Sequence, residues 1–234
     1  MEKTSPLIHL EGLTKRYSST TALDNLTLDL YPGKVIGLIG NNGSGKTTLL
    51  KILAGVLNDW EGTVRICGHE PGPQTKKLLA FLPTAQFLDK TITAGDACNL
   101  YARFFSDFDV SKAHDLLRYF ELPLDKKLKE MSKGMVEKVQ VSLVMSRQAS
   151  IYLLDEPISG VDPATRSIIL QGILRDFNPE ALMILSTHLV ADVEAILDDV
   201  ILINQGKVAR YANVDDLRDE YAMSLDSICR KGLF

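Results

Sequence analysis

The sequence predicts an α/β fold with a mixed, largely parallel sheet, an antiparallel β subdomain and an inserted α-helical subdomain. Residues 35–53 run from an apolar strand-type stretch through a glycine-rich turn into a helix-type pattern. Residues 93–128 read as helices instead, which predicts the insertion. Further apolar runs are typical of strands in a sheet buried on both faces, and they cover residues 78–82, 151–154 and 181–185.

The glycine-rich turn has the form GxxxxGK[ST] and spans Gly40 to Thr47. A chain that wraps a polyphosphate with backbone N–H groups must turn tightly and approach closely. Gly40, Gly43 and Gly45 permit this because they have no Cβ atom and accept positive φ. The next helix directs its free N–H groups and the positive end of its dipole at the anion. We therefore predict a phosphate-binding loop and, with it, a P-loop NTPase core.

Three side chains follow the last glycine of this loop. Lys46 can reach the β- and γ-phosphates, and the hydroxyl of Thr47 is placed to ligate Mg²⁺. Thr48 is expected to add a phosphate contact. The alternative is a glycine-rich turn that binds nothing.

Composition limits the functional classes. The chain has 234 residues, of which 45% are hydrophobic, enough for one core or a core with a small satellite subdomain. The net charge is −4 with no basic stripe, so nucleic-acid binding is disfavoured. The N-terminus lacks the blocks of a signal peptide, and no apolar run approaches the roughly 20 residues that cross a bilayer. Work at a membrane would therefore need another chain to supply the span.

The three cysteines are expected to be idle thiols in a reducing cytosol, because Cys67, Cys98 and Cys229 form no CxxC pair. This spacing argues against a disulfide framework and against a zinc site.

The N-terminal part predicts strands at 7–16 and 22–30, a turn at 31–34 and a further strand at 63–68. Tyr17 stands in a polar turn between the first two strands. From the residues alone it reads as a surface tyrosine.

The helical part contains one clear amphipathic pattern, with Ser111 or Asp109 as its N-cap and Ala113, Leu116, Leu117 and Phe120 on one face. Another helix begins within 131–135. Ser132 is either an ordinary N-cap or, with Gly134, part of a second anion site.

A buried strand type ends in Asp155 and Glu156, at the sheet edge where ligands bind in open α/β folds. Adjacent carboxylates there are costly unless something binds them. Asp155 is suited to hold Mg²⁺ through water, and Glu156 to orient or deprotonate an attacking water. The alternative is that both acids cap the next turn.

The C-terminal part continues the alternation. Asp162 is expected to cap a helix that starts at Pro163. The next buried strand ends in polar residues, of which His188 either hydrogen-bonds a γ-phosphate or is a solvated bystander. A hairpin at 200–211, a helix at 214–221 and a short tail complete the chain.

In their order, these motifs resemble the nucleotide-binding subunit of ATP-binding cassette (ABC) transporters, from about residue 7 to 211. Gly40 to Thr47 matches the Walker A loop, and 151–156 the Walker B strand with its glutamate. Residues 159–162 are similar to the D-loop, and His188 falls at the switch histidine. The resemblance implies one ABC ATPase domain, with the core at about 1–92 and 150–211, a helical subdomain at 93–149, and a C-terminal helix and tail at 212–234.

The resemblance also implies roles for individual residues. Glu156, His188 and Lys46 would be catalytic. Thr47 and Asp155 would hold Mg²⁺, and Tyr17 would stack on adenine. The remaining ATP contacts would come from Asn41, Gly43, Ser44, Gly45, Lys46, Thr47, Thr48, Ser132, Gly134 and Asp162.

The chain departs from the family pattern at two places. Residues 131–135 resemble the signature motif, but Lys133 replaces its first glycine and Met135 its glutamine. The Ser-Lys-Gly form is similar to one found among exporters whose membrane subunit is a separate polypeptide. Thr84 stands where the Q-loop glutamine is expected, so either Gln86 substitutes for it or Mg²⁺ lacks a direct side-chain ligand there.

In this family two subunits pair head to tail, which implies ATP bound between one Walker A loop and the partner's Ser132 and Gly134. The resemblance therefore implies an ATPase at the cytoplasmic side of the membrane, peripheral to a separate integral membrane permease. The ATPase would drive this permease for export, as in the subgroup that has the Ser-Lys-Gly form. Its partner would be a second copy or a related ATPase subunit, and residues 84–96 would contact the permease. The alternatives are a soluble ABC protein without a transport role, a small-molecule kinase and a nucleotide-gated regulator.

Overall fold

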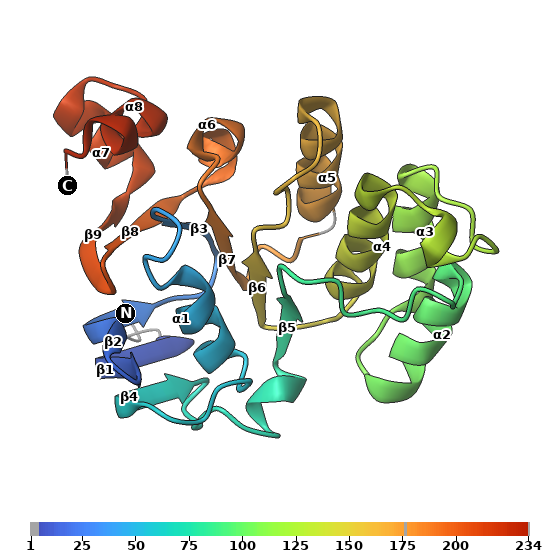
Figure 1. Ribbon diagram of the computed structural model, residues 1–234, viewed down its shortest axis with the longest axis horizontal. Coiled ribbons are helices and arrows are strands. Elements are labelled where there is room, and N and C mark those ends of the chain that lie inside the picture. The colour runs from blue at the N-terminus through green and yellow to red at the C-terminus, as the bar shows by residue number, and fades with distance from the viewer. Residues whose placement is uncertain (1–4, 176, 234) are drawn as a thin grey trace.

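Strands form two sheets in the residues that the computed structural model describes, 5–175 and 177–233 (Figure 1). The larger sheet has the order β5-β6-β7-β3-β8-β9. Its first five strands are parallel, and β9 pairs antiparallel with β8. Their bounds are β5 Leu79–Leu82, β6 Ile151–Asp155, β7 Leu182–Thr187, β3 Lys34–Ile39, β8 Asp199–Asn204 and β9 Lys207–Asn213.

The smaller sheet is antiparallel, with the order β2-β1-β4. Its strands are β1 (Ile8–Tyr17), β2 (Thr20–Leu30) and β4 (Glu61–Ile66). Apolar residues that alternate along β2 are buried in one core with helix α1 (Lys46–Leu53) and one face of the large sheet. This shared core holds the helix that follows the glycine-rich loop against both sheets.

Helices α2 (Ala94–Phe104), α3 (Val110–Tyr119) and α4 (Lys133–Met145) lie together at one end of the molecule (Figure 1). The side chain of Asp109, one of the two expected caps, accepts a hydrogen bond from the N–H of Lys112 and caps α3. A helical turn, η2 (Leu128–Glu130), precedes α4, and another, η1 (Thr75–Lys77), precedes β5. The predicted combination of a mixed sheet, an antiparallel sheet and a helical insertion is confirmed.

The C-terminal part contains α5 (Pro163–Arg175), α6 (Val190–Val193), the turn η3 (Glu194–Ile196), α7 (Val214–Tyr221) and α8 (Leu225–Lys231). The short tail expected after α7 contains a further helix, α8, which the sequence analysis did not predict. Ser224 caps α8 by accepting a hydrogen bond from the N–H of Ser227, and Leu225 and Ile228 are buried. Two apolar residues in a short segment do not make a helical pattern visible in the sequence.

Candidate functional site

A cavity of about 340 Å³ opens at the carboxyl ends of β3, β6 and β7. The glycine-rich loop forms one wall, and the residues just after β6 and β7 form the opposite one. Its lining includes Gly43, Gly45, Lys46, Thr47, Thr48, Thr84, Glu156, Ser159 and His188. The fold therefore places most of the predicted phosphate-loop residues, the glutamate and the histidine around one space.

Two glycines let the loop pack closely on the core. A Cβ atom on Gly40 would lie 2.2 Å from the carbonyl oxygen of Ile203. Gly45 is the N-cap of α1 with φ of +109°, and a Cβ atom there would lie 2.5 Å from the carbonyl oxygen of Ala22. Larger residues at either position would push the loop away from β8 or from β2.

The loop directs polar groups inward. The Lys46 Nζ donates hydrogen bonds to the carbonyl oxygens of Gly40 and Asn41, at 2.7 and 3.2 Å. Burial lowers the pKa of Lys46, although the charges of Glu156 and Asp155 act in the opposite direction. The Oγ of Ser44 is buried without a hydrogen-bond partner in the described part of the chain. A buried hydroxyl without a partner and a buried ammonium group fit a phosphate as ligand.

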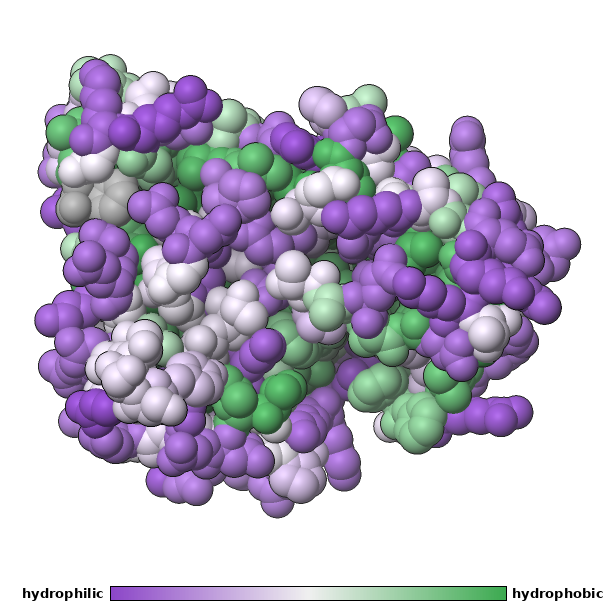
Figure 2. Space-filling model, in the orientation of Figure 1, coloured by the Kyte–Doolittle hydropathy of each residue, from purple (hydrophilic) through white to green (hydrophobic). Residues whose placement is uncertain are grey.

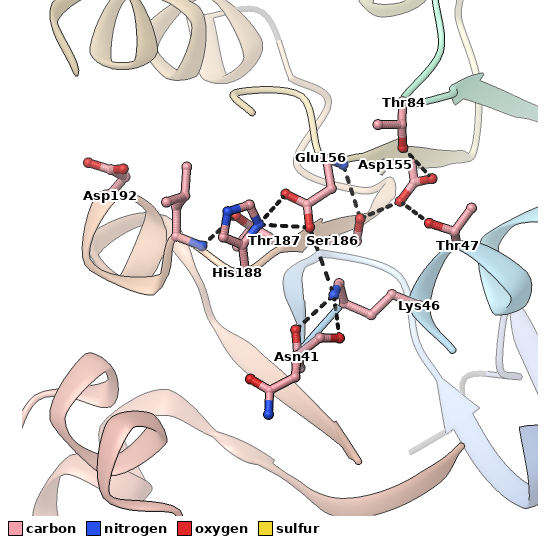
Figure 3. Close-up of polar contacts among 12 residues, drawn as sticks. Asn41, Lys46, Thr47, Thr84, Asp155, Glu156, Ser186, Thr187, His188 and Asp192 are labelled. Carbon is pink, nitrogen blue, oxygen red and sulfur yellow. Dashed lines mark hydrogen bonds and ion pairs between the residues drawn. The ribbon is translucent and has the colours of Figure 1, made fainter. Parts of the chain in front are cut away.

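Asp155 is 1% exposed and accepts three side-chain hydrogen bonds (Figure 3). Its Oδ1 accepts from Ser186 at 2.7 Å and from Thr47 at 3.2 Å. Its Oδ2 accepts from Thr84 at 2.7 Å. The described residues hold no group of three or more His, Cys, Asp or Glu side chains suited to a metal. The all-oxygen set of one carboxylate with hydroxyls nevertheless fits Mg²⁺, which also takes water and phosphate oxygens.

Glu156 projects its carboxylate between two basic groups (Figure 3). The His188 Nδ1 lies 2.9 and 3.1 Å from the two carboxylate oxygens, and the Lys46 Nζ lies 3.8 Å away. Glu156 adopts φ of +54°, and its N–H donates to Ser186 at the end of β7. A non-glycine residue in this conformation is held by its surroundings, here by the neighbouring strand.

Thr84 and Gln86, two polar residues of the loop after β5, lie differently with respect to the cavity. Gln86 is exposed and is not among the residues that line the cavity, whereas Thr84 lines it and contacts Asp155. Substitution of Gln86 for the missing glutamine stays one of two alternatives, and in this structure it is Thr84 that lies beside Asp155. The threonine hydroxyl is close because the chain leaves β5 directly beside β6.

Other predicted site residues lie outside this cavity. Ser132 caps α4 by accepting a hydrogen bond from the N–H of Met135, and Gly134 packs beside Thr165 of α5. Asp162 caps α5, and hydrogen bonds from Thr165 lower its pKa. Tyr17 is 44% exposed, with its ring centroid 5.0 Å from the Lys15 Nζ. Within one chain, these residues therefore do not line the cavity at the phosphate loop.

The structure adds one residue that sequence reasoning did not assign to the site, Ser186, and it places Thr84, the residue at the expected glutamine position, beside Asp155. Both donate to Asp155. Ser186 carries a readable signal, because it is a polar residue at the end of an otherwise apolar run. Thr84 is marked in the sequence only by its place at the expected glutamine, and its contact with Asp155 depends on where the loop lies. The cysteines are free thiols, and burial raises the pKa of Cys98 to about 11.

Comparison with known sequences gives a consistent result. A family model described as ABC transporter matches residues 23–159. An uncharacterized ABC transporter ATP-binding protein of Methanocaldococcus jannaschii is 31% identical over 91% of this chain and 79% of its own length. A Nod factor export ATP-binding protein I of Ralstonia nicotianae is 28% identical over 87% of this chain and 66% of its own length.

Solved structures show the same fold. The ATP-binding subunit of an ABC transporter superposes with a TM-score of 0.85 at 27% identity, covering 96% of this chain and 98% of that one. A dimeric ATP-binding cassette in a post-hydrolysis state, bound to ADP and Pi, gives a TM-score of 0.75 at 21% identity, covering 88% and 98%.

Proposed function

The chain belongs to the family of ABC transporter ATP-binding proteins, and on that premise we propose that it closes head to tail on ATP with a second subunit and drives a separate membrane subunit. The chain is an ATPase subunit of this family. The observation that carries the proposal is the single cavity that Lys46, Thr47, Glu156 and His188 line, with Asp155 beneath it.

The roles we assign follow from these contacts. Lys46 binds the terminal phosphates, with the backbone N–H groups of the loop. Glu156 accepts a proton from the attacking water or orients it, and His188 holds the Glu156 carboxylate and can reach a γ-phosphate. Asn41, Ser44 and Thr48 complete the phosphate contacts. Tyr17 lies on the hairpin that leads to Ala22 at the cavity, which supports the adenine contact we assign to it.

Thr47 and Asp155 would hold Mg²⁺, with Thr84 beside Asp155 at the position of the family's Q-loop glutamine. When bound, the ion would neutralise charge on the β- and γ-phosphate oxygens. Asp155 is buried among three hydroxyl donors, so its carboxylate is already oriented toward the cavity side of Thr47.

The half-site formed by Ser132, Gly134 and Asp162 supports pairing. These residues lie away from the cavity of their own chain, so a second subunit would have to present them to the nucleotide. The γ-phosphate would then contact both subunits, so ATP favours the closed pair and its hydrolysis favours opening. An ATP-binding cassette of the same fold is dimeric in a post-hydrolysis state with ADP and Pi.

A groove between the core and the helical region supports contact with a membrane subunit. Its cavity, of about 220 Å³, is lined mainly by apolar side chains from the end of α1, from β5 and from α2. Figure 2 shows apolar surface on both sides of this hollow. The Phe87 ring lies 6.3 Å from the Tyr101 ring that lines the groove, so residues 84–96, the contact that we propose, border it.

Export is the direction that we propose, in line with the Ser-Lys-Gly form of the signature and with the Nod factor export relative. The structure describes no helix that is both long and apolar enough to span a bilayer. Because the chain belongs to a family of transporter ATP-binding proteins, we propose a peripheral position on the cytoplasmic side of the membrane, bound to the permease.

The decisive experiment is the mass of purified Glu156→Gln protein, by light scattering, with ATP–Mg²⁺ and then with ADP. We expect a dimer with ATP and a monomer with ADP. A monomer that still binds ATP would contradict self-pairing and would point to a different second subunit. A protein that fails to bind ATP would contradict the site itself.

Association with a membrane subunit needs a separate test. The protein should pellet with membranes only when its permease is co-expressed, and Val56→Glu, at an exposed residue that lines the groove, should weaken this. Pelleting that is independent of the permease, or unaffected by this substitution, would count against the proposed groove.

A further inference from the structure

Lys15 is a buried lysine beside the proposed adenine contact. Its side chain is 6% exposed, although it lies on β1 only two residues before the exposed Tyr17. Leu13, Thr14 and Lys15 are buried one after another, which a regular strand does not allow because successive side chains point to opposite faces. The pairing of β1 with β2 shifts register between Leu13 and Lys15 and again between Lys15 and Arg16. Such irregularities re-aim a side chain, and here they turn the lysine inward.

The ammonium group of Lys15 contacts a carboxylate and an aromatic ring. Its Nζ lies 3.0 Å from the Asp59 Oδ2 and stands over the Tyr17 ring, 5.0 Å from the ring centroid. The Asp59 side chain is 95% exposed, so water screens this ion pair and weakens it. A buried ammonium with a solvated carboxylate as its partner is costly unless other groups stabilise the charge. The face of the Tyr17 ring is such a group, because its π-electrons attract a cation at this distance.

The same contact restricts the ring. Tyr17 is 44% exposed at the end of β1. A ligand that stacks on an exposed aromatic side chain must hold it in one rotamer, which lowers the net binding free energy unless the ring is already held. The Lys15 ammonium covers one face, so a base can stack only on the opposite face. A cation on one face also draws electron density from the ring, which favours an electron-rich purine on the other.

We propose that Lys15 is a positioning residue for the nucleotide base, which fixes the Tyr17 ring from one face and leaves the other face free for adenine. The proposal rests on the proposed function, in which Tyr17 contacts adenine, and it assigns Lys15 no contact with the nucleotide itself. Lys15 then changes the affinity that the adenosine group adds, and it leaves the binding of phosphates unchanged.

The test compares the binding of ADP with that of pyrophosphate, both with Mg²⁺, by isothermal titration calorimetry. The two ligands differ by the adenosine group. ADP has no γ-phosphate, so neither hydrolysis nor the proposed ATP-dependent pairing enters the measurement. Lys15→Met removes the charge and keeps an unbranched apolar stem, while the exposed Asp59 carboxylate stays hydrated.

We expect Lys15→Met to weaken ADP binding about fivefold, the usual effect of having to order one more side chain on binding. Pyrophosphate binding should not change. Lys15→Arg should restore ADP affinity, because a guanidinium group also stacks on an aromatic face. If Lys15→Met does not fold, Lys15→Gln, which removes the charge but keeps a polar end, decides the same question.

Arg16→Met is the matched control. Arg16 is the neighbouring cation on β1, has 52% of its side chain exposed and pairs with Glu61 on the surface. Its replacement should leave both affinities unchanged. Equal weakening of ADP and pyrophosphate by Lys15→Met, or the same loss of ADP affinity in Arg16→Met, would overturn the proposal. The charge of β1 would then act on the phosphates from a distance, without the ring.

Tyr17→Leu separates this proposal from the proposed function. It should weaken ADP binding more than Lys15→Met does, because it removes the stacking itself. Adding Lys15→Met to it should cause no further loss, since no ring remains to be held, and a further loss would overturn the proposal. Unchanged ADP affinity in Tyr17→Leu would contradict the adenine contact of the proposed function. Weaker ADP binding in Tyr17→Leu with unchanged binding in Lys15→Met would keep that contact and overturn the role of Lys15.

Discussion

Replacing Arg147 with alanine should destabilise the junction between the helical region and the core. Arg147 lies just after α4 and is 4% exposed in its side chain. Its Nε lies 2.7 and 2.8 Å from the two carboxylate oxygens of Asp107, and its guanidinium carbon is 3.9 Å from the ring centroid of Phe105. One Nη also approaches the carbonyl oxygens of Lys76 and Lys77, before β5.

The size of the loss in unfolding free energy depends on how deeply the remaining charge, that of Asp107, is buried. Removing one partner of a buried ion pair costs about 3 to 5 kcal/mol, because the other charge stays buried. The Asp107 side chain is 24% exposed and can be hydrated in part, so the lower end, about 3 kcal/mol, applies to Arg147→Ala. Losing the guanidinium over Phe105 adds about 1 kcal/mol. We therefore expect a loss of about 4 kcal/mol in the free energy of unfolding.

Urea unfolding followed by circular dichroism measures this loss. Arg118→Ala is the matched control, because Arg118 pairs with Asp115 on the surface with 79% of its side chain exposed, and it should cost less than about 1 kcal/mol. Arg147→Ala combined with Asp107→Ala should cost clearly less than the sum of the single variants. A cost no larger than that of Arg118→Ala, or strict additivity with Asp107→Ala, would refute the reasoning.

The remaining predictions concern the ATP sites. Lys46→Ala should abolish ATP binding or hydrolysis, because Lys46 is the cation of the phosphate loop, and full activity in a phosphate-release assay would refute that assignment. Glu156→Gln should keep ATP binding but slow turnover about 10²- to 10⁴-fold, the usual worth of general-base assistance. Unchanged turnover would remove Glu156 from this role. Ser132→Arg should bind ATP normally but fail to form the ATP-dependent dimer. The bulky, positively charged arginine side chain would lie where α4 meets the partner's nucleotide. An unaffected dimer by light scattering would count against the half-site that we assign to Ser132.

Local pattern was sufficient for the parts of the site that depend on residue type and spacing. The loop from Gly40 to Thr47 and the acids at the end of β6 could be predicted, because a strand followed by these residues restricts the backbone to few arrangements. The choice between Thr84 and Gln86 could not, because it depends on how the loop after β5 packs. The contact of Phe87 with Gln140 belongs to tertiary structure, and no spacing in the sequence announces it.

The two buried charges of the cavity give a physical reason for its specificity. Lys46 is 5% exposed and Asp155 is 1% exposed, but they are not paired with each other. Carbonyl groups accept from the ammonium, while the Glu156 carboxylate lies 3.8 Å from it, and hydroxyl groups donate to the carboxylate of Asp155. The hydrogen bonds of both buried charges therefore go to neutral groups. Neutral partners compensate a buried charge less fully than an ion does. A ligand that brings an anion to Lys46 and a cation to Asp155 would compensate both buried charges. A polyphosphate with a divalent cation does so in one binding event. The same groups would gain much less from a neutral ligand or from a free nucleoside, which is why we assign this cavity to the cation-bound nucleotide and not to either component alone.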